Sequence, residues 1–255
     1  MGESSDPFVI ENEAGRGPYL IVVDHASNHL PAPWSDLGVG PDAMETHIAW
    51  DPGALGVARR MAETLDAPLF RATVSRLVLD LNRPLSSATL IPEVSETTAI
   101  PGNRTLSADD RAARVAAVYE PYHSALEALL ERHTAACAAR GAADVAVVAV
   151  HTFTPVYKGV PRPMHVGILH GRDTRLAAPM LAALGAEPGI VAAANEPYGP
   201  ADEVYWTLDR HAVSRGLPNV MIEIRNDEVR TEDAQARWAD MLVGAMTRKP
   251  GAADD

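Results

Sequence analysis

Short apolar runs of strand length alternate along this chain with longer segments of helical periodicity. The strand candidates are 19–24, 67–71, 77–81, 145–150, 165–169, 189–193 and 218–224. The helix candidates are 51–66, 107–140, 173–185, 202–215 and 232–247. Strands that alternate with helices are typical of α/β proteins with a largely parallel sheet. We therefore predict one three-layer α/β domain in which helices flank a mostly parallel, mixed central sheet.

The predicted domain spans the whole chain, 1–255, with flexible ends at 1–16 and 249–255. Within the long helix candidate, Pro121 predicts a kink or a break because proline lacks the N–H that an interior helical position needs. The segment 84–106 contains three prolines and reads as a long loop. Loops of this length in compact domains often bind ligands or cover active sites.

Composition excludes several classes of partner. The formal net charge is −12 and no Lys/Arg cluster stands out, so we expect no nucleic-acid binding. No apolar run approaches the ~20 residues of a membrane span, and the acidic N-terminus lacks the apolar core of a signal peptide. The single cysteine, Cys137, fits a reducing cytoplasm. We expect a cytoplasmic protein with a small-molecule substrate; the sequence does not determine its oligomeric state.

Polar side chains gather at the ends of the strand candidates. Asp24-His25 ends the first strand, His151 ends another, and Glu223 lies inside an apolar strand. Asp80, Asn82 and Arg83 follow a further apolar run. Ligands of open α/β sheets bind beyond the carboxyl ends of the strands, so we expect these groups to meet there. The simpler alternatives are that the histidines only pack in the interior and that Asp80 is a structural carboxylate.

These residue types are those of a metallohydrolase. Two histidines and a carboxylate are the protein ligands of a catalytic zinc site, which keeps a further position open. A second carboxylate can act as a general base. The pair Asn82-Arg83 suits a substrate carboxylate because the planar guanidinium can bind it in a bidentate manner.

The chain resembles the N-formylglutamate amidohydrolase family. The matching stretches, in order, are DHASNHLP, HIAWDPGA, SRLVLDLNRP, IPGNRTLS, PYHSAL, VAVHTFTP, NEPYGP and VMIEIRND, between residues 24 and 227. The resemblance implies a zinc carboxypeptidase-like (phosphorylase/hydrolase-like) fold and a zinc-dependent amidohydrolase that cleaves an N-formyl, or another N-acyl, amide. It makes His25 and His151 metal ligands and Glu223 the catalytic carboxylate. Arg76 becomes a carboxylate or oxyanion contact.

The third metal ligand stays open at this point. Zinc carboxypeptidases use His-x-x-Glu, whereas the same spacing here gives Asn28, a poor zinc ligand. The candidates are Asp51, His47 and His29, and Asp51 could instead be the cap of the helix that follows it. We choose Asp51, because a residue at the point where a helix begins can reach a metal site.

Further substrate contacts are expected from Asn103, Arg104, Tyr198 and Arg225. Two other functions remain possible alternatives. One is a non-catalytic protein that binds small carboxylates on the same fold. The other is a metal-independent hydrolase that uses Ser27 with His25 or His29, and a chelator would leave its activity intact.

Overall fold

A seven-stranded mixed sheet forms the centre of the computed structural model, which describes residues 6–199 and 202–248. The strands in spatial order are β1 (Phe8–Glu11), β3 (Leu69–Ala72), β2 (Tyr19–Val23), β6 (Ala146–Phe153), β11 (Asn219–Arg225), β9 (Val166–Leu169) and β10 (Ala192–Ala194). The pairs β1–β3 and β9–β11 are antiparallel, and the other neighbours are parallel. The predicted mostly parallel, mixed sheet is therefore confirmed.

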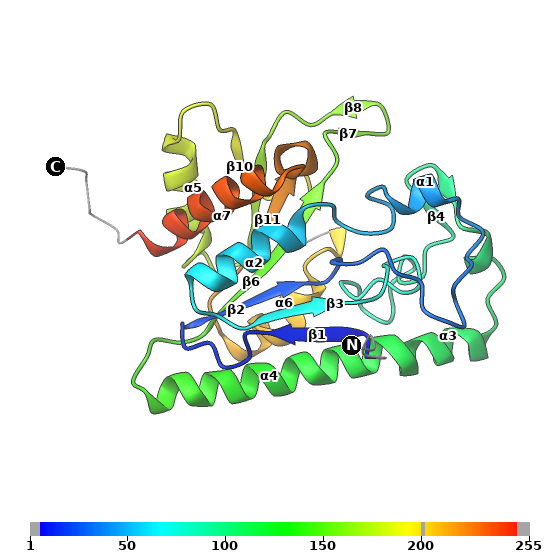
Figure 1. The fold of residues 1–255 in the computed structure, drawn as a ribbon, viewed down its shortest axis with the longest axis horizontal. Helices are drawn as coiled ribbons and strands as arrows, with labels where there is room; N and C mark the ends of the chain where they lie inside the picture. The colour runs from blue at the N-terminus through cyan, green and yellow to red at the C-terminus, as the bar shows by residue number, and fades with distance from the viewer. Residues whose placement is uncertain (1–5, 200–201, 249–255) are drawn as a thin grey trace.

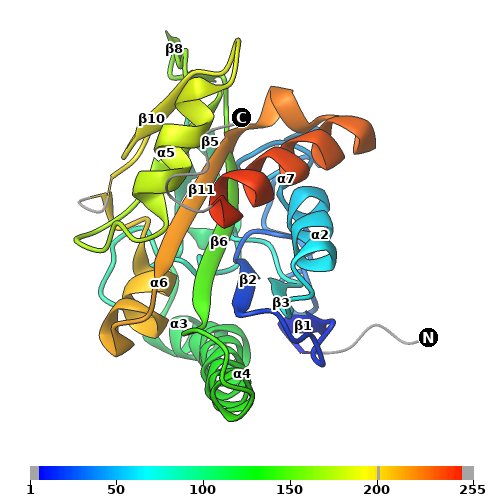
Figure 2. The ribbon, with the colours of Figure 1, turned by 90° about the vertical axis from the view of Figure 1, so that its left-hand side faces the viewer.

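Helices cover both faces of the sheet, as Figures 1 and 2 show. The helices are α1 (Pro41–Met44), α2 (Ala54–Thr64), α3 (Ala108–Arg114), α4 (Glu120–Ala139), α5 (Ala177–Ala186), α6 (Trp206–His211) and α7 (Glu232–Thr247). One core cluster joins α4 and α6 to one face, and the other joins α2, α5 and α7 to the opposite face. The three-layer α/β architecture is thus the observed one.

The long helical segment differs from a simple kinked helix. Helices α3 and α4 are joined by a π-helical turn, Val115–Tyr119, which ends two residues before Pro121. A wider turn at this point accommodates the proline, which can neither donate a backbone hydrogen bond nor pack against the carbonyl four residues earlier. The sequence located the irregularity correctly, and the chain continues through it as helix.

The strand predicted at 77–81 is wrong. Ser75 and Asp80 side chains accept hydrogen bonds from the backbone N–H groups of Leu77 (3.2 Å) and Asn82 (2.9 Å), which holds this segment in turns. Such local side-chain bonds compete with a strand ladder. The apolar side chains of this segment are nevertheless buried. The apolar run in the sequence therefore indicated burial correctly, but it did not indicate a strand.

Two other expectations need correction. The segment 1–16 was expected to be a flexible end, but Phe8–Glu11 form β1, which pairs antiparallel with β3 and is itself an edge strand of the sheet. The helix expected at 202–215 is shorter, since only Trp206–His211 are α-helical and a 3-10 turn follows at Val213–Arg215. The other expected flexible end, 249–255, lies outside the described residues.

Two short hairpins project from the connections on the side of the sheet where β6 and β11 end. They are β4–β5 (Val94–Ser95 with Thr98–Ala99) and β7–β8 (Val156–Tyr157 with Val160–Pro161). Figure 1 shows β4 and the β7–β8 hairpin on the same side of the molecule as α1. The 3-10 turns Pro101–Asn103 and Asn226–Val229 complete the elements used below.

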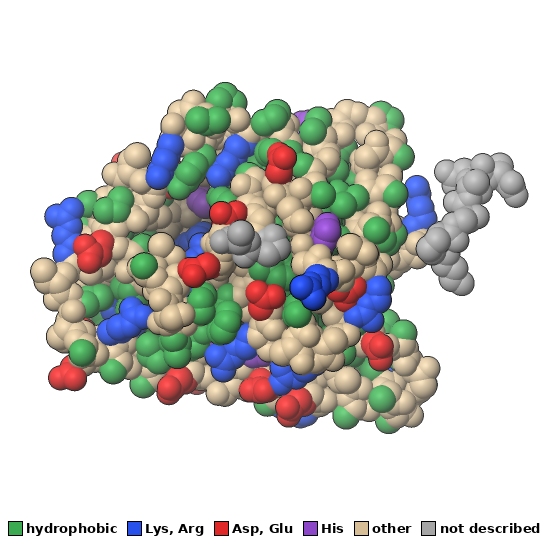
Figure 3. Space-filling model, turned by 180° about the vertical axis from the view of Figure 1, so that it is seen from behind, with side chains coloured by type: hydrophobic (Ala, Val, Ile, Leu, Met, Phe, Trp, Pro, Cys, Tyr) green, Lys and Arg blue, Asp and Glu red, His purple; other side chains and the backbone are tan. Residues whose placement is uncertain are grey.

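Acidic and basic side chains are interspersed over the face seen in Figure 3. Within 6–199 and 202–248, no helix combines the length and the apolar character that crossing a bilayer requires.

Candidate active site

The carboxyl ends of three neighbouring strands bring the predicted site together. His25 follows β2, His151 lies near the end of β6, and Glu223 lies on β11, where it pairs in register with His151. All three side chains are buried. Because β2, β6 and β11 are parallel, their polar ends meet at one edge of the sheet, as expected from the sequence.

Asp51 reaches the same point from the segment that precedes α2. Its backbone N–H donates to the carbonyl oxygen of His25 (2.9 Å), which ties the two segments together. Gly53, two residues later, has a φ of 86° and lies against Val229, where a Cβ would come within 2.5 Å of a side-chain carbon. Because the chain makes a close, left-handed turn at this glycine, the Asp51 side chain points into the site and does not cap the helix.

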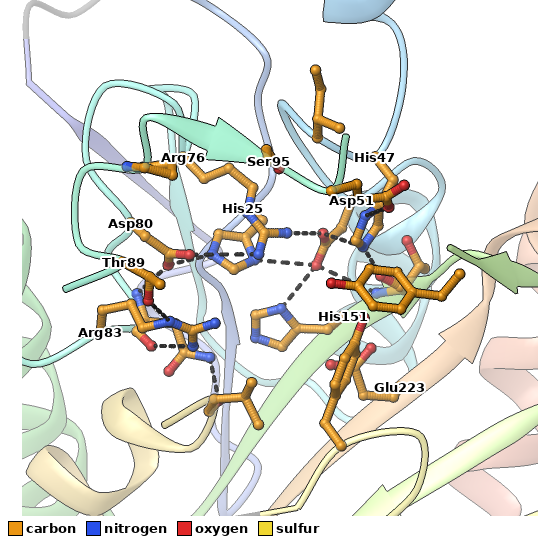
Figure 4. Close-up of a pocket in the computed structure, with 18 of the residues that line it drawn as sticks. His25, His47, Asp51, Arg76, Asp80, Arg83, Thr89, Ser95, His151 and Glu223 are labelled. Atoms are coloured by element: carbon orange, nitrogen blue, oxygen red, sulfur yellow. Dashed lines mark hydrogen bonds and ion pairs between the residues drawn. The ribbon is translucent and has the colours of Figure 1, made fainter. Parts of the chain in front are cut away.

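His25, Asp51 and His151 form a compact group of possible metal ligands. One ligand atom from each lies within 4.8 Å of the other two. The Nδ1 atoms of His25 and His151 both face Oδ2 of Asp51, at 3.3 and 2.8 Å. Figure 4 shows the three side chains converging on one point. Two imidazole nitrogens and a carboxylate oxygen are the donor set of a catalytic zinc site.

Each histidine also contacts a further carboxylate through its other ring nitrogen, Nε2. Nε2 of His25 lies 2.8 Å from Oδ1 of Asp80, and Nε2 of His151 lies 3.3 Å from Oδ2 of Asp24. Carboxylates in this position fix the ring orientation of metal-binding histidines and raise their basicity. The residues of the site therefore fit a divalent metal ion that would be bound through the Nδ1 atoms.

The charges of the buried groups also favour a cation. Burial alone would raise the pKa of Asp51, but the charge of His25 and the hydrogen bonds of His151 and His25 hold it well below its usual value. Burial would lower the pKa of His151, but its hydrogen bonds to Asp24 and Asp51 raise it to about 10. Despite its burial, Asp80 has a pKa below its usual value, because the charges of His25, Arg83 and Arg76 favour the carboxylate. Ionised carboxylates thus surround both imidazoles.

Glu223 differs from these carboxylates. Burial raises its pKa to about 7, because the opposing charge of His151 only partly compensates for the loss of solvent. Its Oε2 is buried and has no hydrogen-bond partner in the described parts of the chain. A carboxylate with a pKa near neutrality and a free oxygen can take up and release a proton during a reaction.

A cavity of about 200 Å³ opens in front of this group. Arg76 lines it and donates to Oδ1 of Asp51 (3.0 Å) and to Oδ2 of Asp80 (3.5 Å). Other residues in its wall are His47, Ile48, Asp80, Asn82, Arg83, Thr89, Pro92, Val94, Ser95, Glu96, Thr152, Tyr157, Tyr198 and Val204. The two projecting hairpins thus contribute Val94 to Glu96 and Tyr157 to the cavity wall.

Arg83 and Asn82 border the cavity in different ways. The Asn82 amide donates to the carbonyl of Val204 and accepts from the N–H of Thr207 (3.0 Å), so it anchors the segment before α6. Arg83 donates through Nε to Thr89 and through Nη1 to the carbonyls of Asn82 and Glu203. These bonds hold its guanidinium at the cavity, and its Nη2 makes no hydrogen bond within the described ranges.

The remaining predicted substrate contacts are distributed unevenly. Tyr198 lines the cavity, and its hydroxyl accepts a hydrogen bond from Arg162 (3.1 Å). Asn103 lies elsewhere: its amide donates to the carbonyls of Leu77 and Pro92, both at 2.8 Å, and fastens the proline-rich loop. Arg104 is exposed outside the cavity wall, and Arg225 pairs with Asp227 and Glu228. The structure therefore does not bring Asn103, Arg104 or Arg225 to the cavity.

The alternatives for the third ligand do not belong to this group, although His47 lines the same cavity and its Nε2 lies 3.7 Å from Oδ1 of Asp51. Nε2 of His47 bonds to the carbonyl of Thr152 (3.1 Å), and His29 is exposed beside a different cavity of about 580 Å³. The cap of α2 is Gly53, so Asp51 does not act as the N-cap. Ser27 accepts from the backbone N–H of His29 and lines that other cavity. No serine–imidazole pair involving Ser27 exists in the described structure.

Asp24 and Asp80 are the residues of this site that the sequence did not assign to function. Asp24 stands next to His25 in the sequence but contacts His151, and it also accepts from the hydroxyls of Tyr122 (2.8 Å) and Thr207 (2.9 Å). Asp80 was expected to be a structural carboxylate, whereas its Oδ1 faces His25. The only sequence signal for Asp24 was its place at a strand end.

Comparison with known proteins agrees with this geometry. Comparison with curated proteins finds no match. A gene product of Agrobacterium tumefaciens has a similar structure, with a TM-score of 0.90, 42% identity and 96% of each chain covered. N-formylglutamate amidohydrolase from Ralstonia eutropha has the same fold, with a TM-score of 0.60, 20% identity, and 94% of this chain and 95% of that chain covered. The family model described as N-formylglutamate amidohydrolase matches residues 17–229, a range that includes every side chain of the metal-ligand group. The chain therefore belongs to the N-formylglutamate amidohydrolase family.

Proposed function

We propose that this protein is a metal-dependent amidohydrolase whose metal is zinc. Its substrate is a small N-formyl or N-acyl amino acid with a free α-carboxylate, of which N-formylglutamate is the reference compound for the family. The observation that carries the proposal is the pair of imidazoles whose Nδ1 atoms face Asp51 and whose Nε2 atoms face Asp24 and Asp80. Family membership supports the amidohydrolase class.

His25, Asp51 and His151 would hold the ion, which when bound supplies Lewis acidity and lowers the pKa of water. Glu223 accepts a proton from the attacking water through its free Oε2. The water oxygen adds to the formyl carbon, and Glu223 returns the proton to the nitrogen as the C–N bond breaks. The products are formate, or the corresponding acid, and the free amino acid.

The other cavity residues orient the substrate. Arg83 binds the α-carboxylate through the part of its guanidinium that the protein leaves free. Burial and the charge of Glu223 raise the pKa of Tyr198 to about 12, so its hydroxyl keeps its proton and can donate it in a hydrogen bond. Arg76, which lines the same cavity, shares the charge that develops on the carbonyl oxygen.

Release of formate from N-formyl amino acids tests the proposal. We expect the purified protein to hydrolyse them and Asp51→Asn to lose both turnover and bound metal, because the variant weakens one ligand and breaks the Arg76 ion pair. Asp240→Asn, which removes a carboxylate from an exposed pair with Arg60, is the matched control and should behave as wild type. Equal turnover by Asp51→Asn and wild type would contradict the assignment.

A further inference from the structure

A second carboxylate besides Glu223 faces the cavity with an oxygen that lacks a hydrogen-bond partner. Glu96 lies in the turn of the β4–β5 hairpin and lines the cavity. Its Oε1 is buried and accepts no hydrogen bond from the described residues. Buried acceptors in proteins are almost always satisfied, so such an oxygen at a substrate cavity indicates a donor that arrives with the substrate.

His47 faces Glu96 from the same cavity wall, but it does not satisfy this oxygen. Its Nδ1 lies 3.6 Å from Oε1 of Glu96, beyond the range of a normal hydrogen bond. Its Nε2 donates to the carbonyl of Thr152, since a carbonyl oxygen can only accept. His47 thus faces Glu96 at a distance that leaves Oε1 able to accept a hydrogen bond from another donor.

Glu96 carries its charge at neutral pH. Contact with His47 lowers its pKa, burial opposes this shift, and the charges of Arg162 and Arg76 add to the lowering. The hairpin thus places a permanent negative charge in the cavity wall.

The cations at the cavity suffice for one substrate carboxylate. His47 already faces Asp51 and Glu96, and Arg76 already bonds to Asp51 and Asp80, which leaves Arg83 for the α-carboxylate. Arg162 is stacked between the rings of Tyr157 and Tyr198, at 4.5 and 4.8 Å from their centroids, and lies behind the cavity wall that these rings form. A second carboxylate in the substrate would therefore meet Glu96 without a free cation beside it.

We propose, on the basis of the function assigned above, that Glu96 is a specificity-determining residue. It selects N-acyl amino acids whose side chain ends in a hydrogen-bond donor, a carboxamide or a cation, over those whose side chain ends in a carboxylate. The attractive part of this selection is a hydrogen bond to Oε1. The repulsive part is the juxtaposition of like charges, which is an efficient way to reject a close analogue.

The test compares three Nα-formyl amino acids: glutamate, its uncharged isostere glutamine, and the cationic ornithine. Calorimetric binding and formate release are measured for wild type, Glu96→Gln and Glu93→Gln. Glu93 is an exposed neighbour outside the cavity wall, so its variant removes the same charge from the same loop. We expect wild type to favour the glutamine and ornithine compounds over the glutamate compound by at least about tenfold.

In Glu96→Gln this preference should fall by about tenfold, mostly through tighter binding of the glutamate compound, whereas Glu93→Gln should keep the wild-type order. A wild-type preference for the glutamate compound, or an unchanged order in Glu96→Gln, would overturn the inference. The two readouts separate it from the catalytic proposal. Selective binding without formate release would leave the role of Glu96 standing and refute the amidohydrolase, and failure to bind any of the three would refute both.

Discussion

Glu223 and His151 are direct neighbours in the sheet, paired across the parallel strands β11 and β6. Strand register fixes this relationship, so a carboxylate with a free, buried oxygen is held beside a candidate metal ligand. Burial raises the pKa of this carboxylate to about 7, although the charge of His151 opposes the shift. Such a group is placed and tuned to exchange a proton with water near neutral pH.

Glu223→Gln should therefore lower kcat by about 10²–10⁴-fold, because the amide keeps the shape of the side chain and removes the base. Bound metal and the affinity for a product amino acid should change much less, since neither role belongs to Glu223. Steady-state kinetics, metal analysis and calorimetry on the one variant check this. Loss of metal in parallel with rate would make Glu223 a ligand, and a nearly normal kcat would make it structural.

The same residue should affect the stability of the chelator-treated protein. Its pKa is about 7 in the folded chain against 4.5 for the free group, so the folded state binds the proton more tightly and its stability falls as pH rises from about 4.5 through 7. The pKa difference corresponds to about 3 kcal/mol. Glu223→Gln should then be more stable than wild type at pH 8, and this advantage should shrink towards pH 4.5. Thermal unfolding at several pH values measures it, and an advantage that does not grow with pH would refute the assigned burial effect.

Asp24 and Asp80 should control metal affinity without touching the metal. Replacing either one by Asn keeps a hydrogen-bond acceptor and removes the charge behind His151 or His25. We expect metal affinity to fall by about 10–100-fold, which is the usual effect of losing a carboxylate that hydrogen-bonds to a metal-binding histidine. Competition with a chromogenic chelator measures it, with Asp240→Asn as the surface control. Wild-type affinity in both variants would show that the two carboxylates only pack the histidines.

Arg83 should determine the preference for a free α-carboxylate. In Arg83→Ala we expect KM for N-formyl amino acids to rise by at least about tenfold, and kcat to fall as well if the contact sets the register of the substrate. The corresponding amides, which lack the charge, should lose little. If wild type hydrolyses acids and amides equally well, Arg83 does not recognise the carboxylate.

The sequence predicted the site residues correctly where a polar residue interrupts or ends an apolar strand. His25, His151 and Glu223 each interrupt or end an apolar run, and the carboxyl ends of parallel strands bring such residues together. Asp51 was preferred to His47 and His29 only for its place where a helix begins, and its competing role as a helix cap has the same local signature. The structure gives the cap position to Gly53.

Other features depend on contacts between distant segments. Asp80 meets His25 across 55 residues and Asp24 meets His151 across 127, and no local pattern encodes either pairing. Asn103 was expected to contact the substrate from the proline-rich loop, yet its amide is saturated by backbone carbonyls and by Arg114. The run 77–81 is apolar enough for a strand, but the Ser75 and Asp80 side chains capture its backbone N–H groups.

The most direct test of the central claim is formate release from N-formyl amino acids before and after removal of metal from the purified protein. We expect a chelator to abolish the activity and about one equivalent of Zn²⁺ per chain to restore it, as a site of three protein ligands requires. His25→Ala combined with His151→Ala should retain no metal and should not recover. Full activity in the chelated wild type would contradict the account, and so would full metal occupancy in the double variant.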